Sequence, residues 1–174
     1  MTTFSTPKNR KKVVIRKRRS IEDDFRLDTI ADECASVVSI YSNDKTLKNE
    51  LTRLFYNTLN IDFNLWSWVR SLAADGKFSL HLEIDRKLGV IAVTPYYGSG
   101  KGLECFELAQ FVLDIDPKQL LARVDDGIFT PRFYRYIGRM QSKIIEQFTI
   151  IAVIHLFLVG YRGKKLENFT LDMG

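Results

Sequence analysis

The stretch that decides the fold runs from residue 61 to residue 95 and reads IDFNLWSWVRSLAADGKFSLHLEIDRKLGVIAVTP. Its first half has helical periodicity, and four apolar side chains share one predicted face: Leu65, Trp66, Val69 and Leu72. Gly76 follows the last turn, and a glycine there tolerates the left-handed geometry that ends helices. We therefore predict an amphipathic helix that ends at Asp75 and Gly76, with tryptophan in its buried stripe.

Beyond Gly76 the apolar period falls to two, as in a half-buried strand. One face holds Phe78, Leu80, Leu82 and Ile84, and the polar residues between them occupy the other face. Residues 86–89 form a short connection into a second apolar run, residues 90–93, and Pro95 closes that strand. The stretch thus predicts a helix followed by a β-hairpin.

Upstream, Ser20 with Asp23 resembles a capping box, and the apolar spacing predicts helical structure through residues 21–41. Asn43 and Asp44 interrupt it and offer a new cap. A second helix is predicted over residues 45–59, with one apolar stripe: Leu47, Leu51, Leu54, Phe55 and Leu59.

Downstream, residues 104–116 have strand-like periodicity, residues 117–124 suit a short helix, and a long apolar helix is expected from Arg132 to about Leu158. The fold class is therefore α+β, with amphipathic helices on a β-hairpin or small antiparallel sheet. Four regions are predicted: a basic arm (1–20), a helical and hairpin region (21–95), a glycine-rich loop or chain gap (96–105), and a strand, long helix and terminal strand (106–174).

The charge of the chain is unevenly distributed. The first 20 residues hold no acid and eight of the 26 bases: Lys8, Arg10, Lys11, Lys12, Arg16, Lys17, Arg18 and Arg19. The other 18 bases stand against 21 acids, so the body is mildly acidic and the basic balance belongs to the arm. We expect a flexible or partner-ordered arm that contacts nucleic acid or neighbouring subunits, without aromatic residues for stacking on bases.

Two cysteines, Cys34 and Cys105, are too few for a disulfide scaffold or a cysteine-rich zinc site, and reduced thiols are expected. The apolar run of residues 148–159 is interrupted by His155 and is shorter than the roughly 20 residues that span a bilayer. It predicts a buried helix and no membrane span. His155 is expected to be a core or interface histidine that makes one hydrogen bond.

The motifs in this chain that could indicate nucleotide binding, metal binding or catalysis are incomplete. The loop of residues 98–102, GSGKG, lacks the first glycine and the Ser or Thr of a P-loop. His81 and Glu83 have the spacing of a zinc-deaminase motif without its paired cysteines, and Asp114 with Asp116 would share a strand face without a nucleophile nearby. We therefore expect no enzyme, no catalytic residue, no metal and no cofactor.

Several segments together resemble the wing region of portal proteins from contractile-tailed bacteriophages of the T4-like group. The main one is KNELTRLFYNTLNIDFNLWSWVRSLAADGKFSLHLEID, residues 48–85. Ala31-Asp32-Glu33 is similar to an early helix of the family, and residues 136–139 to its Tyr-Gly-Arg element. Residues 141–151 are similar to its long helix, and residues 171–174 to its Ile-Asp-x-Gly strand end. Family members are far longer, so the resemblance implies a partial chain or a short relative.

The resemblance implies a structural subunit of a dodecameric ring at one capsid vertex of the virion, assembled in the host cytoplasm. Its implied partners are copies of itself, the packaging motor (terminase), neck proteins, the major capsid protein and the double-stranded DNA that passes through. Four aromatic residues are candidates for the core or for subunit contacts: Trp66, Trp68, Phe148 and Phe157. The alternatives are a nucleic-acid-binding accessory domain that uses the basic arm and a degenerate nucleotide-binding enzyme that uses Lys101.

Overall fold

The structure of the protein is a computed structural model that describes residues 20–127 and 130–174. The elements, in chain order, are α1 (Ile21–Cys34), β1 (Val38–Tyr41), α2 (Lys45–Arg53), a π-helical turn η1 (Leu54–Thr58), α3 (Ile61–Asp75), β2 (Lys77–Asp85), β3 (Gly89–Pro95), a 3-10 turn η2 (Cys105–Glu107), β4 (Leu108–Val112), α4 (Pro117–Asp125), α5 (Pro131–Leu158), a 3-10 turn η3 (Gly163–Glu167) and β5 (Thr170–Met173). The fold is α+β, as predicted.

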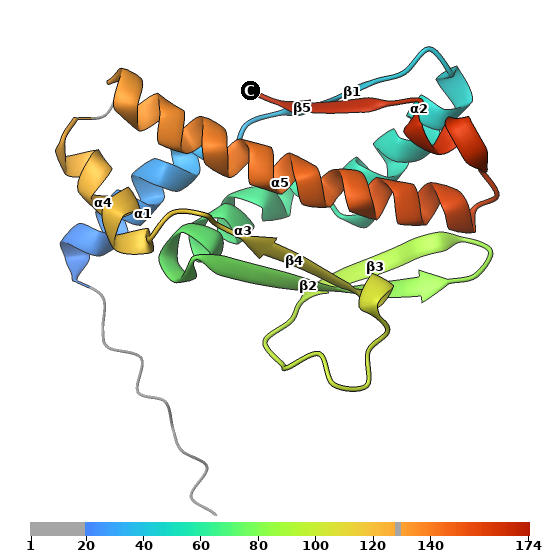
Figure 1. Ribbon diagram of the computed structural model, residues 1–174, viewed down its shortest axis with the longest axis horizontal. Helices are drawn as coiled ribbons and strands as arrows, with labels where there is room; N and C mark the ends of the chain where they lie inside the picture. Colours follow the sequence, from blue (N-terminus) through green and yellow to red (C-terminus); the bar gives the residue numbers. More distant parts are fainter. Residues whose placement is uncertain (1–19, 128–129) are drawn as a thin grey trace, which may run out of the picture.

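The long helix α5 lies between two antiparallel sheets (Figure 1). On one side is a ribbon in which β1 pairs with β5, with Val38 opposite Met173. On the other side is a sheet with the order β3-β2-β4, in which Phe78 of β2 lies opposite Phe111 of β4. Helices α1 and α3 pack on each other, and α3 also contacts β2.

The helix-to-hairpin switch is confirmed. Gly76 ends α3 with φ +73°, and its amide donates to the carbonyl of Leu72. Phe78, Leu80 and Leu82 are buried along β2. The Asp85 carboxylate accepts hydrogen bonds of 2.8 Å from the amides of Lys87 and Leu88, which shapes the turn into β3.

The two tryptophans of α3 differ from the prediction. Trp68 is buried at 7% exposure, whereas Trp66, the tryptophan predicted in the buried stripe, is 39% exposed. Successive residues of a helix are about 100° apart, so Trp68 lies closer than Trp66 to the direction set by the buried residues Leu65, Val69 and Leu72. The buried stripe of α3 therefore carries one tryptophan, and the other faces outward.

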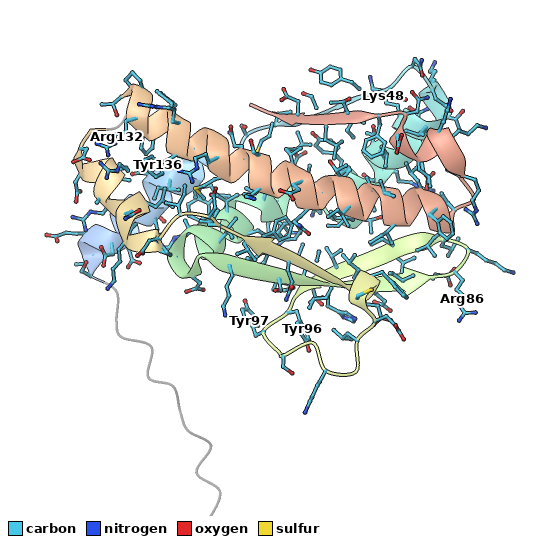
Figure 2. All side chains as sticks on the ribbon, viewed as in Figure 1. Lys48, Arg86, Tyr96, Tyr97, Arg132 and Tyr136 are labelled. Carbon is cyan, nitrogen blue, oxygen red and sulfur yellow. The ribbon has the colours of Figure 1, made fainter. Side chains whose placement is uncertain are left out.

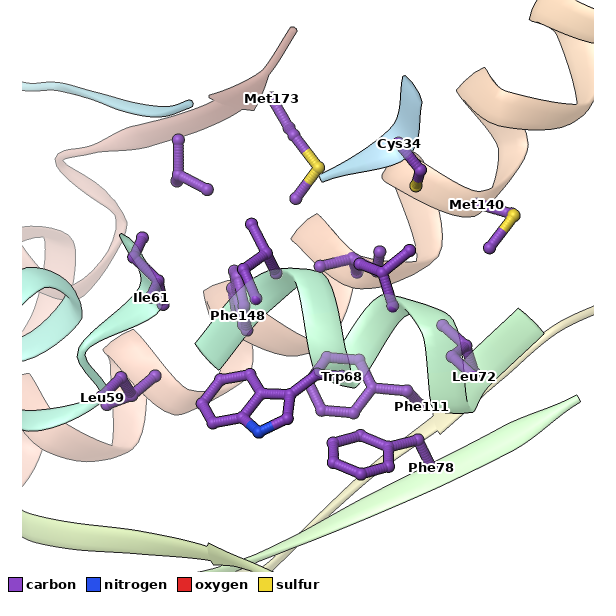
Figure 3. Close-up of a cluster of buried hydrophobic side chains, with 14 of the residues drawn as sticks. Cys34, Leu59, Ile61, Trp68, Leu72, Phe78, Phe111, Met140, Phe148 and Met173 are labelled. Carbon is purple, nitrogen blue, oxygen red and sulfur yellow. The ribbon is translucent and has the colours of Figure 1, made fainter. Parts of the chain in front are cut away.

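The core gathers residues from the helices and from both sheets (Figure 3). Phe148 of α5 is fully buried, and its ring centroid lies 5.4 Å from that of Phe55 and 5.7 Å from that of Phe111. The ring of Phe78 lies 6.2 Å from that of Trp68. Aromatic pairs at these distances add to the free energy of burial, so these contacts join α5 and α3 to the three-stranded sheet.

Two predicted elements are shorter than expected. Helical structure stops at Cys34, and residues 38–41 form β1, because their alternating burial matches the pairing with β5. The strand expected over residues 104–116 is confined to Leu108–Val112. The predicted short helix and the long helix are confirmed as α4 and α5, and Ser20 caps α1 by accepting from the amide of Asp23.

Among the described residues, α5 is one helix whose length and composition would allow it to cross a membrane. The core helix of a soluble protein can meet the same criteria. In this fold one face of α5 is buried against the neighbouring elements, from Phe133 at its start to Leu156 at its end.

Candidate functional site

The predicted contact residues fall into three groups. Trp68 and Phe148 are buried in the core, and Trp66 and Phe157 are exposed. The guanidinium of Arg162 lies 3.9 Å from the ring centroid of Phe157. The eight basic residues of the arm, from Lys8 to Arg19, lie outside the described residues.

Helices α1 and α3 run antiparallel and are joined by a row of polar contacts, which we name the α1–α3 face. The indole nitrogen of Trp66 donates to Asp32 at 2.7 Å. The guanidinium of Arg70 donates to Asp28 at 2.7 Å and to Asp24 at 3.0 Å. These carboxylates hold the pKa of Arg70 above its usual value, with the hydrogen bond to Asp28 as the largest cause. The face thus positions the partly exposed indole ring against one carboxylate and Arg70 against two others.

Large apolar side chains are exposed on the same two helices. Phe63 precedes Trp66 by three residues and is 77% exposed, and Phe25 of α1 is 68% exposed. Residues three apart on a helix lie on the same side. The α1–α3 face thus combines acidic and aromatic groups, the composition of an interaction surface rather than of a catalytic cleft.

A pocket of about 140 Å³ opens at one end of the α1–α3 face. Its walls come from residues 35–38, which connect α1 to β1 and begin that strand, and from Ile61, Asp62, Leu65 and Trp66 of α3. Val37 is 70% exposed at this site. We name it the acid-rimmed pocket, because Asp62 lines it and Asp32 is bonded to its tryptophan.

A second surface lies near the β2–β3 turn, where a groove is lined by residues of the hairpin, of α2 and η1, and of the end of α5. The exposed residues here include Leu88 and Ile91. β3 is an edge strand, so one side of its backbone is not paired within the sheet. Figure 2 shows Arg86 at this end of the molecule and Arg132 at the opposite end.

His155 lies buried beside this groove at 3% exposure, and it makes two hydrogen bonds rather than the one predicted. Its Nδ1 accepts from the amide of Val90 at 3.0 Å, and its Nε2 lies 2.8 Å from the Glu50 carboxylate. Because Nδ1 accepts, the neutral ring carries its proton on Nε2 and donates it to Glu50. The histidine therefore joins α5, α2 and β3.

The pKa shifts of His155 and Glu50 agree with this arrangement of hydrogen bonds. Burial lowers the pKa of His155 below 6.5, against the opposing effect of the Glu50 carboxylate. Burial acts to raise the pKa of Glu50, but hydrogen bonds from His155 and Arg53 lower it overall. Gly89 makes the close approach possible, because a Cβ at this residue would lie 2.4 Å from Nδ1 of His155. These contacts of His155 with Val90 and Glu50 hold three elements of the fold together, and we name them the His155 joint.

The other residues considered as candidates for catalysis or metal binding do not lie together in one site. Asp114 and Asp116 lie beyond β4 and do not share a strand face, because the strand ends at Val112. Asp114 pairs with Arg139 at 3.0 Å, and Asp116 caps α4. His81 lies 3.9 Å from Glu107. Within residues 20–127 and 130–174, no three His, Cys, Asp or Glu side chains are grouped so that they could hold a metal ion.

The cysteines and the glycine-rich loop add no further site. Cys34 is buried, and burial raises the pKa of its thiol to about 12, so it is a core residue rather than a nucleophile. Cys105 is exposed. In the loop of residues 98–102, the amide of Gly100 donates to the Tyr96 hydroxyl, so this amide is committed to an internal contact.

The α1–α3 face is the feature that sequence reasoning missed. Its signal is present in the chain, because Asp24, Asp28 and Asp32 recur every four residues, as do Trp66 and Arg70. Comparisons of the chain with protein-family models, with curated proteins and with solved structures find no match.

Proposed function

We propose that this chain is a portal-type structural protein: a subunit, or the wing-like part of one, in a ring at a viral capsid vertex. The ring would pass double-stranded DNA during packaging and ejection and would join head to tail. Its partners would be copies of itself, a terminase motor, neck proteins and the major capsid protein. The chain would act as a passive conduit and docking body without catalytic activity.

One observation carries this proposal: the resembling segments pack together as one unit. Residues 48–85 form the continuous run from α2 through η1 and α3 to β2, while residues 136–151 belong to α5 and residues 171–174 include the end of β5. Helix α5 contacts α2 and β5, and these elements share one core. Segments that resemble the family in order along the chain therefore also meet in space.

The surface composition supports the same proposal. A closed ring needs two different contact faces on each subunit, because its interfaces are head-to-tail. The chain offers the acidic and aromatic α1–α3 face and, separately, the mixed polar and apolar groove beside β3. In Figure 1, α1 begins at one end of the long axis and the β2–β3 turn lies at the other.

The test is the assembly state of the intact protein, measured by light scattering after gel filtration and by negative-stain imaging. We expect ring-shaped particles with a central hole and a mass that is a multiple of 20.2 kDa, with or without DNA. A protein that stays monomeric at high concentration, or that turns over a small molecule, would contradict the proposal. Binding to DNA that weakens with a log-log salt slope of about −0.9 per contact, without rings, would favour the accessory-domain alternative.

A further inference from the structure

The acid-rimmed pocket has the properties of a preformed receptor for an apolar side chain. Its lining is mostly apolar, with Val37, Leu65 and Trp66 among its walls. The indole ring of Trp66 is held by the hydrogen bond to Asp32, so it presents a fixed wall although it is 39% exposed. An oriented, half-exposed tryptophan beside a small cavity is typical of an anchoring site at a protein interface.

One carboxylate, Asp62, lines this pocket, and the acidic helix α1 ends beside it. Asp62 lines the pocket, and Glu33 lies in the last turn of α1, next to Asp32. Within residues 20–127 and 130–174, neither Asp62 nor Glu33 forms an ion pair with Lys or Arg. Helix α1 as a whole carries six carboxylates and one base. A fitting occupant combines an apolar side chain for the pocket with cations for the adjacent carboxylates.

The chain itself contains such a segment. Residues 10–12 are Arg-Lys-Lys, residues 13–15 are Val-Val-Ile, and residues 16–19 are Arg-Lys-Arg-Arg. Three branched apolar side chains are thus flanked by seven cations with no acid between them. The cations of the arm are complementary in charge to Asp62, which lines the pocket, and to the acidic helix α1 beside it.

The reach of the chain favours a second copy as the source of the arm. Ser20 directly precedes α1, and the 14 residues of that helix separate it from the pocket by about 21 Å at a rise of about 1.5 Å per residue. Ile15 is five residues from Ser20 and can reach about 18 Å at full extension, and Val13, seven residues away, can reach about 25 Å. The arm of the same copy would have to reverse at Ser20 and lie nearly extended along α1. The arm of a second copy is not restricted by this distance along α1.

We propose that the basic arm of one copy docks in the acid-rimmed pocket of a neighbouring copy, with Val13, Val14 or Ile15 against Trp66 and the flanking cations on Asp62 and Glu33. This inference rests on the proposed self-association and specifies one of its contacts. The arm then acts as a strap between subunits, and its charge is used on protein rather than on DNA.

The first test uses a fluorescent peptide of residues 8–19 as the probe and the intact protein as the receptor. We expect a rise in anisotropy at about 0.15 M salt, and binding about tenfold weaker for a peptide whose residues 13–15 are all serine, since its charge is unchanged. Trp66→Ala in the receptor weakens binding by a similar factor. Tyr97→Ala is the matched control, because Tyr97 is an exposed aromatic residue outside the α1–α3 face and does not line the pocket.

Charge reversal sharpens this test. The receptor variant Asp62→Lys should bind the peptide at least about tenfold more weakly, and a peptide with Lys12→Glu should recover part of the loss. Equal binding of the native and serine peptides, or no effect of Trp66→Ala, would overturn the proposal, because either result would mean that the arm binds by charge alone or elsewhere.

The second test determines whether the arm in the pocket belongs to the same copy of the chain or to a neighbouring copy. A photo-crosslinking amino acid replaces Val14 in the intact chain, and isotopically heavy and light proteins are mixed before irradiation. Crosslinks from residue 14 to residues 35–38 or 61–66 that join a heavy chain to a light chain support the proposal. Crosslinks within one chain, or to other residues, overturn it. Rings that form while these crosslinks are absent refute the strap but leave the portal proposal standing, whereas a monomer refutes both.

Discussion

The α1–α3 face and the His155 joint use polar groups in opposite ways. On the face, Arg70 and its two carboxylate partners are about a quarter to a half exposed. At the joint, one histidine at 3% exposure is bonded to a backbone amide and to a carboxylate. Exposed ion pairs contribute little to the free energy of unfolding, whereas a buried group that loses its partner costs a great deal. The joint therefore holds the fold, and the face leaves a surface on which a partner can bind.

Replacing His155 by alanine should destabilise the protein more than any other single substitution in these two regions. The variant leaves the amide of Val90 and the Glu50 carboxylate without their partner and opens a cavity between α5 and β3. We expect a loss of about 3 to 5 kcal/mol in the free energy of unfolding, measured by urea denaturation.

His81→Ala is the matched control, because His81 is half-buried on the outer face of β2 and should change stability by less than about 0.5 kcal/mol. If both histidine variants unfold at the same urea concentration, the joint does not hold these elements together and the contrast between the two regions disappears.

A pair of glycine variants separates backbone strain from side-chain contact at the joint. Gly89 and Gly102 have nearly equal φ angles, +82° and +83°, but a Cβ at Gly102 has no neighbour within 4 Å, whereas one at Gly89 meets His155 at 2.4 Å. Gly102→Ala should cost about 1 kcal/mol from the left-handed backbone alone. Gly89→Ala should cost about 2 to 3 kcal/mol, because the imidazole must also move. Equal midpoints in thermal unfolding would argue against the close contact.

The sequence predicted elements whose signals are local. The change of period at Gly76 and the cap at Asp44 depend on neighbouring residues, and both were predicted correctly. β1 was missed because its four residues follow a helical pattern and its partner β5 lies at the far end of the chain. No local sequence pattern indicates the pairing of β1 with β5, so the first helix was predicted to continue over residues 38–41, which form a strand.

Site residues show the same limit. His155 was predicted to be a core or interface residue, but its second bond depends on the register that brings Val90 to α5, which local periodicity does not specify. Trp66 and Trp68 lie two residues apart in the sequence. A small error in the predicted helical phase assigned Trp66, rather than Trp68, to the buried face. The ladder of Asp24, Asp28 and Asp32 was readable from its spacing of four, but only the packing of α3 shows what it contacts.

Acid should weaken the joint more than the face. The folded-state pKa of His155 lies below its ordinary value of 6.5, so the unfolded chain binds more protons in the interval between the two values. The contribution of His155 is fully present above about pH 6.5 and is lost as the pH falls toward the folded-state pKa, at no more than about 1.4 kcal/mol per pH unit. Glu50, whose pKa is also lowered, adds a further loss below its ordinary value of 4.5.

The measurement is the urea midpoint between pH 7 and pH 5 for three proteins. The native chain and His81→Ala should both lose stability over this interval, and His155→Gln should lose less, because its amide does not titrate. Arg53 and Glu50 are the charged groups that act on the imidazole, and both are retained in every variant. A slope that persists in His155→Gln would assign the pH dependence to other groups.

Replacing Arg70 by methionine should have the smallest effect of the series. Methionine keeps an apolar stem on α3 and removes the bonds to Asp24 and Asp28, which are about half exposed. We expect a loss of less than about 1 kcal/mol at low salt, shrinking further at about 0.5 M salt, because solvent and ions screen exposed pairs. The same variant makes the α1–α3 face more acidic, so it should bind the arm peptide at least as tightly as the native protein. A loss of several kcal/mol would mean that the face, like the joint, is needed for folding, and variants there would no longer report on association alone.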